Sequence, residues 1–384
     1  MEKKIIVCKF GGSSVKKEGI EQNIKQIVEE NQNRRIIVVS APGKAQKKDK
    51  KVTDLLISAF LEQNKFDFWM NEVQSVFEDL IFRLKVDFDV ECEIRKIKRH
   101  FRLFKSKSYL FSRGEYLSAK IFAKYLDAKF VDAAKLIKFY SNGKINPKTY
   151  DKIRKLGKRG ERVVIPGFYG STIFGKIKVM SRGGSDITGA ICARALTNSV
   201  YENWTDVDGF FEDNESAIVI EKMNYDDMKF LSFFGSSVVH SKCANICEES
   251  KTILKNTFNR SAMGTTICKN VDSVSFGHAT RSCVEFCLQN TKQNQKIIKK
   301  LKGEILFRQV VLGKLFIGIV FSKGYSSERN EKKLQKAAFC VRNVDVDAYI
   351  LQKSNQIQAI KKKHEHAHII LNDGNRWVFV EEKV

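Results

Sequence analysis

This sequence contains little proline, no long apolar run and no regularly spaced set of cysteines. Only three of the 384 residues are proline, and no Pro-rich or Gly/Ser-rich linker divides the chain. The longest strongly apolar runs, such as Leu315 to Phe321, fall far short of the roughly 18 residues that a membrane-spanning helix needs. Near the N-terminus the apolar stretch covers only Ile5 to Cys8, too short for the core of a signal peptide. We therefore expect no membrane span and a cytoplasmic protein.

The number of cysteines and the net charge further limit the class of protein. The nine cysteines are odd in number and scattered, which predicts reduced thiols rather than a disulfide framework. The 43% of hydrophobic residues and 29% of charged residues are typical of a folded protein, with length for about two to three domains. The formal charge of +24 could attract a polyanion, but the charge is spread along the chain, so a coding bias toward AT-rich codons is the favoured explanation. A nucleic-acid partner is therefore disfavoured.

Strand and helix patterns alternate through the first two thirds of the sequence. The β-branched runs at Lys3 to Phe10 and Arg34 to Ser40 each lead through a glycine-containing loop into a helical pattern, which is typical of a parallel α/β sheet. Further on we expect helices over most of 65 to 127, a buried strand at Arg162 to Phe168, a hairpin at Ser171 to Ser181, a helix at Ser185 to Leu196, and strands near Val200 to Asn203 and Thr205 to Phe211. Residues 1–270 are predicted to form one domain.

The pattern changes in the last third. We expect a helix near Asn294 to Lys302, strands at Glu304 to Val311 and Lys314 to Phe321, and a helix near Glu328 to Cys340. This order predicts a smaller C-terminal α+β domain over residues 272–384, with a regulatory or dimerisation role.

Two pairs of adjacent glycines give the strongest functional signal. In KFGGSS at 9 to 14, a predicted strand ends at two glycines and a predicted helix begins, so backbone amides of the first helical turn are available to a ligand. Lys9 comes just before the glycines. No Walker A sequence is present. In SRGGSD at 181 to 186 the same chemistry recurs beside an arginine and an aspartate. Each segment alone could be a tight turn or an ordinary helix cap, but two such turns facing each other would hold a polyanion from both sides.

Nine motifs occur in an order that resembles the aspartate kinases of the amino acid kinase superfamily, over about residues 1 to 268. They are KFGGSS at 9–14, VVSAPGK at 38–44, KVTDLL at 51–56, SRGEYLSAK at 112–120, SRGGSDITGA at 181–190, WTDVDG at 204–209, FGSSVVH at 234–240, KNTFN at 255–259 and GTTI at 264–267. The resemblance implies a three-layer αβα fold with a mainly parallel central sheet, followed by a divergent or shortened ACT-like domain.

The resemblance also implies an activity and residue roles. The reaction would be ATP-dependent phosphorylation of the side-chain carboxylate of L-aspartate, the first step toward lysine, threonine and methionine. Lys9 would stabilise the transferring phosphoryl group and Asp186 would hold that lysine and the glycine amides in place. Aspartate would contact Ser40, Thr53, Glu115, Arg182 and Ser185, and the nucleotide would contact Gly11, Gly12, Ser13, Gly183, Gly184, Thr205, Asp206 and Phe211. Mg²⁺ would be held mainly by ATP phosphates, so no metal-binding residues are expected, and the C-terminal domain would join two or more copies.

Departures from the family pattern predict altered binding. Phe211 stands where many relatives have tyrosine, the following residues lack an arginine, and Ser237 stands where many relatives have lysine. We therefore expect weakened ATP binding. The 113 residues after 271 are few for two ACT domains. We expect that much of the response to lysine or threonine has been lost.

Other interpretations remain open at the level of sequence. A sister kinase such as glutamate 5-kinase shares the first motif, and a non-catalytic binding protein could keep the fold. Two groups of residues could hold a metal: His240, Cys243 and Cys247, and the alternating His364, His366 and His368. Packing of buried thiols is favoured for the first group, and a solvent-facing edge strand for the second.

Overall fold

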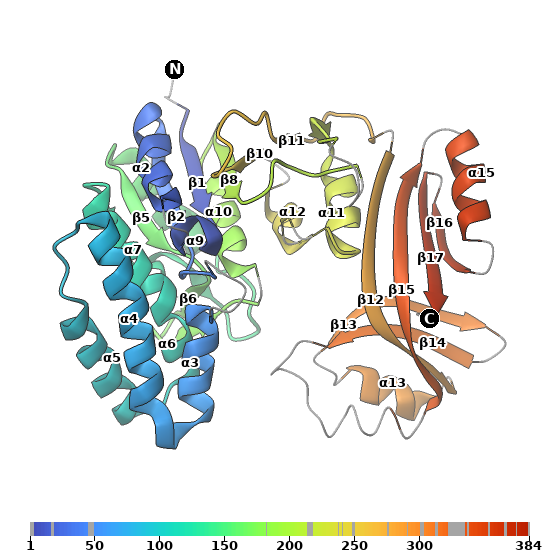
Figure 1. Cartoon of the computed structure of the whole chain (residues 1–384), viewed down its shortest axis with the longest axis horizontal. Helices are drawn as coiled ribbons and strands as arrows, with labels where there is room; N and C mark the ends of the chain where they lie inside the picture. The colour runs from blue at the N-terminus through green and yellow to red at the C-terminus, as the bar shows by residue number, and fades with distance from the viewer. Residues whose placement is uncertain are drawn as a thin grey trace. The chain divides into compact units, whose positions relative to one another are not determined.

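The chain forms two compact units (Figure 1). The computed structural model describes residues 4–16, 19–44, 50–181, 183–212, 218–236, 238–239, 241–247, 250–274, 276–289, 291–299, 303–311, 314–321, 335, 338–351, 354–364, 367–373 and 375–382. The first unit comprises Met1–Phe210, Val219–Tyr225 and Val238–Val271, and the second comprises Phe211–Ile218, Asp226–Ser237 and Asp272–Val384. Within the described ranges, no helix has both the length and the apolar character to cross a bilayer.

A mainly parallel eight-stranded sheet forms the centre of the first unit. Its strands run in the order β3-β5-β2-β1-β8-β10-β11-β9. Their bounds are β1 Ile6–Phe10, β2 Arg34–Val39, β3 Lys129–Phe130, β5 Val163–Pro166, β8 Val200–Thr205, β9 Lys222–Met223, β10 Lys251–Asn256 and β11 Thr265–Ile267. The neighbouring pairs from β3 to β10 are parallel, and β11 pairs antiparallel with β10. A second sheet of three strands comprises β4 Lys138–Phe139, β6 Tyr169–Thr172 and β7 Ile177–Val179.

Helices cover both faces of the large sheet. Their bounds are α1 Gly12–Lys16, α2 Ile20–Glu30, α3 Val52–Leu61, the 3-10 helix η1 Gln63–Lys65, α4 Phe66–Leu84, α5 Val90–Phe104, α6 Lys107–Phe111, α7 Arg113–Tyr125, α8 Ala133–Leu136, α9 Lys148–Lys158, α10 Gly184–Arg194 and α12 Ser241–Cys247. Cys8 and Phe10 of β1 point to the face that packs on α2 and α7, whereas Gly189 of α10 packs on Tyr201 from the opposite face. The first unit therefore has three layers, helix, sheet and helix.

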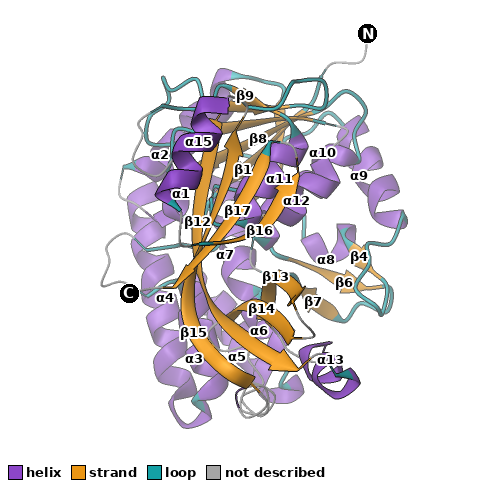
Figure 2. Ribbon diagram, turned by 90° about the vertical axis from the view of Figure 1, so that its right-hand side faces the viewer, coloured by secondary structure: helices purple, strands orange, loops and turns teal. Residues whose placement is uncertain are grey.

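The second unit is built on an antiparallel sheet of six strands in the order β13-β14-β12-β15-β17-β16. The two long strands β12 and β15 run side by side at its centre (Figure 2). The elements are α11 Tyr225–Phe233, whose residues from Asp226 belong to this unit, β12 Phe276–Gln289, α13 Lys292–Lys299, β13 Gly303–Val311, β14 Lys314–Phe321, β15 Ala338–Leu351, α15 Ser354–Lys363, β16 His368–Asp373 and β17 Arg376–Glu382.

The fold class predicted from the sequence is confirmed, with local corrections. The strands predicted at 3–10, 34–40, 162–168, 200–203, 304–311 and 314–321 are present, as are the hairpin and the helix after the second diglycine turn. The expected strand from Thr205 to Phe211 is wrong, because β8 runs without a break from Val200 to Thr205 and ends there. The predicted helix near Glu328 to Cys340 is wrong at its C-terminal end, because residues from Ala338 onward belong to strand β15. Most of the other residues of that predicted helix lie outside the described ranges. The functional assignment of the two predicted domains stays a prediction.

The packing of α10 on the sheet generates a test of this fold. A Cβ atom at Gly189 would lie 2.5 Å from Cε2 of Tyr201, whose side chain is fully buried. We expect Gly189→Ala to lower the free energy of unfolding by about 1–3 kcal/mol, because the ring cannot move away. Gly157→Ala in α9 is the matched control, because its Cβ would meet the methyl ends of Leu196 and Ile5.

The control should be close to neutral, since Leu196 is partly exposed and can shift, and alanine favours the helix by about 1 kcal/mol. Urea unfolding followed by circular dichroism measures both variants. Equal stability of the two variants would contradict the packing described for α10.

Candidate active site

The predicted site residues of the first unit gather at one edge of the large sheet. Strands β1, β2, β5 and β8 are parallel neighbours, so their carboxyl ends lie together. The loops that begin at Gly11, Ser40, Gly167 and Asp206 follow these four ends. In open α/β sheets this edge is where ligands bind.

A buried ion pair connects the two diglycine turns. Lys9 Nζ lies 2.6 Å from Asp186 Oδ1, and their side chains are only 10% and 12% exposed. Lys9 is two residues before Gly11-Gly12, and Asp186 is two residues after Gly184. The pair therefore brings β1 and the start of α10 together, as the sequence argument requires of a phosphate-binding site.

Asn203 of β8 completes this cluster. It lies opposite Lys9 in the register of β1 and β8. Its Oδ1 accepts a hydrogen bond from Lys9 Nζ at 3.2 Å, and its Nδ2 donates to Asp186 Oδ1 at 3.3 Å. The lysine charge is thus held between a carboxylate and an amide oxygen, and its position is fixed by three elements.

The turn at residues 41–43 packs against the first diglycine pair at van der Waals distance. A Cβ atom at Gly12 would lie 2.9 Å from the Ala41 carbonyl oxygen, and Gly43 N donates to the Gly12 carbonyl oxygen at 2.9 Å. Gly114 at the start of α7 packs on the same turn, because its Cβ would lie 2.8 Å from Ala41 Cβ. Ser40 N donates to the Phe10 carbonyl oxygen at 3.1 Å. Only glycine fits at these contacts, and the turn brings β1, β2 and α7 together.

Glu115 lies beside this turn in a state that is unusual for a carboxyl group. Its side chain accepts hydrogen bonds from its own backbone amide and from that of Ala41, and the residue is 6% exposed. The second oxygen, Oε2, is buried without a hydrogen-bond partner among the described residues. Burial raises the pKa of Glu115 to about 8, against a lowering by the backbone bonds and by Arg113. The carboxyl group is therefore mostly protonated at neutral pH.

Thr53 lies near the same turn, in the first turn of α3. The backbone amide of Val52 donates to the Pro42 carbonyl oxygen at 3.3 Å, which ties the start of α3 to the turn. Thr53 is partly exposed. Ser40, Thr53 and Glu115, three of the predicted substrate-binding residues, are thus arranged around residues 41–43.

The second diglycine turn packs on the end of β5. Gly183 has a φ of 72°, a left-handed conformation that favours glycine, and α10 starts directly after it. A Cβ at Gly184 would lie 2.9 Å from Phe168 Cα, and a Cβ at Gly167 would lie 2.6 Å from Ser185 Cβ. Ser185 is buried at this contact. Arg182 falls outside the described residues.

Some of the residues predicted to contact the nucleotide lie together at the end of β8. Gly11 N donates to the Trp204 carbonyl oxygen at 3.1 Å, which places the first diglycine turn beside the end of β8. Thr205 Oγ1 donates to Asp206 Oδ1 at 3.1 Å at that strand end. Phe211 belongs to the second unit and is partly buried. Ser237 lies outside the described residues.

Sequence reasoning missed Asn203 and one further contact. Ser14 Oγ, in α1, lies 2.8 Å from Thr257 Oγ1, and both hydroxyl groups are buried. Two adjacent polar residues, Glu202 and Asn203, within a buried parallel strand were the available signal for Asn203. Thr257 lies in the KNTFN motif, whose position beside Ser14 depends on the pairing of β10 with β8.

Two buried thiols, those of Cys243 and Cys247, lie close to Asp186 and to each other. Cys243 Sγ lies 3.8 Å from Cys247 Sγ on α12 and 3.4 Å from the Asp186 carbonyl oxygen. The hydrogen bond with Cys247 and burial raise the pKa of Cys243. Both residues are free cysteines. This fits packing of reduced thiols, and His240, their predicted companion, lies outside the described residues.

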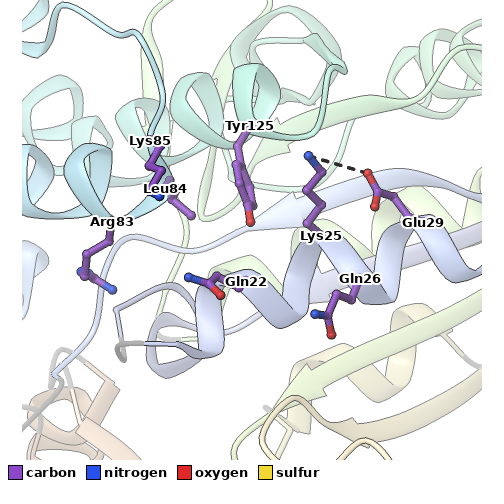
Figure 3. A pocket seen from close by; sticks show the side chains of 8 residues that line it. All are labelled: Gln22, Lys25, Gln26, Glu29, Arg83, Leu84, Lys85 and Tyr125. Atoms are coloured by element: carbon purple, nitrogen blue, oxygen red, sulfur yellow. Dashed lines mark ion pairs between the residues drawn. The ribbon is translucent and has the colours of Figure 1, made fainter.

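A polar cavity of about 310 Å³ lies elsewhere on the first unit (Figure 3). It is lined from α2, the end of α4, the following residue and α7, by Gln22, Lys25, Gln26, Glu29, Arg83, Leu84, Lys85 and Tyr125. Lys25 pairs with Glu29 at 3.9 Å and lies over the Tyr125 ring. None of the residues predicted to bind substrate or nucleotide lines this cavity.

Taken together, the edge of the sheet provides a fixed buried cation, two glycine turns with backbone amides, and a buried carboxyl group with an unpaired oxygen. Such a set can neutralise phosphate oxygens on one side and receive a cationic group on the other.

Comparison with known sequences agrees with this geometry. The family model for the amino acid kinase family matches residues 4–256. Aspartokinase 3 of Bacillus subtilis is 31% identical over 299 residues, which cover 70% of this chain and 64% of that protein. Aspartokinase 1, chloroplastic, of Arabidopsis thaliana is 26% identical over 71% of this chain and 54% of that protein. The chain thus spans less than two thirds of the length of these curated relatives.

Solved structures share the fold along almost the whole chain. The crystal structure of Clostridium acetobutylicum aspartate kinase has a TM-score of 0.76 and 27% identity, and covers 99% of this chain and 96% of its own. E. coli aspartokinase III, in complex with aspartate and ADP, has a TM-score of 0.79 at 19% identity, with 98% of this chain and 96% of that chain covered. The family model matches more than half of the chain, residues 4–256. The chain therefore belongs to the amino acid kinase family.

Proposed function

We propose that this protein is an aspartate kinase, which transfers the γ-phosphoryl group of ATP to the side-chain carboxylate of L-aspartate. The observation that carries the proposal is the buried pair of Lys9 and Asp186, 2.6 Å apart, between two glycine turns at the carboxyl edge of the sheet. The aspartokinase names of the relatives and the site residues of the resembling motifs support the same activity.

The phosphate chain would lie between the two turns. The backbone amides of Gly12 and Ser13 would approach it from one side, beside Gly11, whose own amide is bonded to the Trp204 carbonyl oxygen. Gly183 and Gly184 at the start of α10 would approach it from the other side. Lys9 would neutralise charge on the transferring phosphoryl group, where charge spreads over the equatorial oxygens in the transition state. Asp186 and Asn203 hold Lys9 in place and so act as positioning residues.

The amino acid would lie beside residues 41–43. The Oε2 atom of Glu115 has no partner among the described residues, and an ammonium group is the partner that suits it. Ser40, Thr53 and Ser185 supply hydroxyl groups nearby, and Arg182 would pair with a carboxylate. An α-amino acid with a second carboxylate satisfies both kinds of contact.

The nucleotide would contact Thr205, Asp206 and Phe211. Mg²⁺ would be held mainly by phosphate oxygens and water. The donor set fits this arrangement, because the carboxylate beside Lys9, that of Asp186, is already paired with the lysine. When bound, Mg²⁺ would offset charge on the phosphates.

The chemistry then needs no general base. An oxygen of the aspartate side chain is ionised at neutral pH and forms the new bond to the γ-phosphorus. The bond from that phosphorus to the bridging oxygen breaks, and ADP leaves with the electron pair. The protein contributes position and charge neutralisation.

The wider setting follows from the same proposal. The product, 4-phospho-L-aspartate, would feed lysine, threonine and methionine biosynthesis in the cytoplasm. The second unit, an α+β assembly, would serve as a divergent ACT-like domain that joins copies of the chain in a homodimer or larger homo-oligomer.

Substitution of Lys9 tests the proposal directly. We expect Lys9→Ala to reduce kcat with aspartate by at least about a hundredfold, or about 3 kcal/mol of transition-state stabilisation. Coupled ADP release measures the rate with aspartate, with glutamate and without acceptor, and trapping of the acyl phosphate as hydroxamate identifies the product.

Lys148→Ala, which removes an exposed lysine from the start of α9, is the matched control and should keep full activity. Circular dichroism establishes that both variants are folded. Faster turnover of glutamate than of aspartate, or ADP release that does not depend on an acceptor, would refute aspartate kinase activity.

Glu115 gives a second prediction, for the ligand-free protein. Its pKa of about 8 in the folded state exceeds the ordinary value of 4.5, so the folded state holds the proton more tightly than the unfolded state. The stability that this proton contributes is fully present below about pH 4.5 and is lost as the pH rises through about 8. Glu115→Gln cannot ionise and should gain stability over the wild type between pH 5 and pH 8.5, on the order of a few kcal/mol.

Urea unfolding at both pH values measures this difference. Glu72→Gln, an exposed residue of α4, is the control and should follow the wild-type pH dependence. Parallel stability curves for Glu115→Gln and the wild type would show that Glu115 is ionised in the free protein.

Substrate binding provides a third prediction. If aspartate requires the ionised form of Glu115, its KM should rise as the pH falls below the pKa of about 8. The ionised fraction falls from about one half at pH 8 to a few per cent at pH 6.5, so KM should rise roughly tenfold. Initial rates at saturating MgATP measure it. Glu115→Gln should have a high KM that changes little with pH, and a wild-type slope in that variant would remove Glu115 from the binding site.

A further inference from the structure

A second cluster of ligand-type side chains lies wholly within the second unit. His278 is on β12, Asp347 on β15 and Glu381 on β17, and His364 directly follows α15. Strands β12, β15 and β17 are consecutive in the sheet. The register pairs His278 with Tyr349 and Asp347 with Phe379, so these side chains share one face. Figure 1 shows α15 alongside this end of the sheet.

Three of the four groups lie close to one another, and the fourth, His278, lies beside Asp347. His278 Nε2 is 3.0 Å from Asp347 Oδ1, and His364 Nδ1 is 2.8 Å from Glu381 Oε1. Ligand atoms of Asp347, His364 and Glu381 all lie within 4.8 Å of one another. The side chain of His364 is only 3% exposed, those of His278 and Asp347 are 14% exposed, and that of Glu381 is 38% exposed. The cluster is therefore partly enclosed and open on the Glu381 side.

Aromatic neighbours hold the two imidazole rings. The His278 ring stacks on Tyr349 with 4.3 Å between centroids, and the His364 ring stacks on Phe379 at 4.7 Å. Tyr349 Oη lies 2.9 Å from His364 Nε2. A hydrogen bond from Nε2–H to this oxygen would leave the lone pair of Nδ1 directed at the carboxylate side, which is how a second-shell partner orients a metal-binding histidine.

The chemistry of the set favours a divalent transition-metal ion. Two imidazole nitrogens and two carboxylate oxygens are ligands that zinc takes, and a 2+ charge balances two carboxylates that lie close together at low exposure. Ligand atoms in a tetrahedral zinc site are about 3.4 Å apart, as follows from bond lengths of about 2.0–2.1 Å. Movements of about 1 Å would therefore close the site around Asp347, His364 and Glu381, and His278 would join it from beside Asp347.

We propose that His278, Asp347, His364 and Glu381 bind one divalent metal ion, with Zn²⁺ as the fitting member of the class, and that this ion fastens the end of α15 to β12, β15 and β17. All four residues belong to the second unit, and none of them is among the residues predicted to bind substrate or nucleotide. The site also differs from the histidine trio suggested by the sequence, of which it uses only His364.

Zinc titration of the full-length, chelator-treated protein tests this site. Isothermal titration calorimetry with Zn²⁺ should detect one equivalent of tight binding in the wild type. His364→Gln and Asp347→Asn should each weaken that binding by at least about a hundredfold. Tyr349→Phe, which removes only the hydroxyl group beside Nε2, should weaken it roughly tenfold. His100→Gln is the matched control, because His100 is a histidine of α5 in the first unit.

The nine cysteines are competing ligands, so the metal's own spectrum is the second measurement. X-ray absorption of the zinc-loaded wild type should show a first shell of nitrogen and oxygen with imidazole scattering, and the cobalt-substituted protein should lack a thiolate charge-transfer band. This measurement does not depend on whether a variant folds.

Sulfur in the first shell, no stoichiometric binding by the wild type, or unchanged binding in folded His364→Gln would each overturn the proposal. In the last two cases the cluster would consist of two histidine–carboxylate hydrogen bonds only. Zinc should also raise the unfolding temperature of the wild type and of His100→Gln but not that of Asp347→Asn, and an equal rise in Asp347→Asn would likewise contradict the site.

Discussion

The contact between Lys9 and Asp186 is the constraint on which the arrangement of the carboxyl edge of the large sheet depends. A lysine and an aspartate this deeply buried are stable only when they are paired, because each has lost its water. The pair fixes the start of α10 against the end of β1, and Asn203 fixes both against β8. The two glycine turns follow from it, since each lies within two residues of one partner.

A second constraint acts at residues 41–43. Backbone approaches backbone where Gly12 meets this turn, and α7 begins against the same turn through Gly114. This packing buries Glu115 deeply enough to raise the pKa of its carboxyl group to about 8. A buried acid with one oxygen unpaired lowers the stability of the empty protein. The ammonium group of the proposed substrate would return that free energy, so ligand binding and the stability of the fold would be coupled at Glu115.

The sequence was sufficient to predict elements and motifs whose signal is local. The β-branched runs that became β1 and β2 and the diglycine turns are encoded within a few residues of one another. Asn203 depends instead on the pairing of β1 with β8, and the buried pair of Arg34 with Glu202, 2.8 Å apart, depends on the same long-range register. The resemblance places Phe211 at the nucleotide site because it stands where many relatives have tyrosine, and this assignment stays a prediction. The division of the chain between Phe210 and Phe211 into two units depends on contacts between distant segments, which the local sequence does not encode.

The histidines near the C-terminus show the same limit in another form. Spacing by two places His364 and His368 on one face only if the whole segment is a strand, and the structure ends α15 at Lys363 and begins β16 at His368. His364 is therefore buried against Phe379 and Glu381. Its neighbours Tyr349, Phe379 and Glu381 come from strands β15 and β17, which lie before and after it in the sequence. In both units, then, the chemically unusual groups are brought together by contacts between segments that are distant in the sequence. Sheet register does this for Lys9 and Asn203, and the packing of helices does it for Asp186 and Glu115.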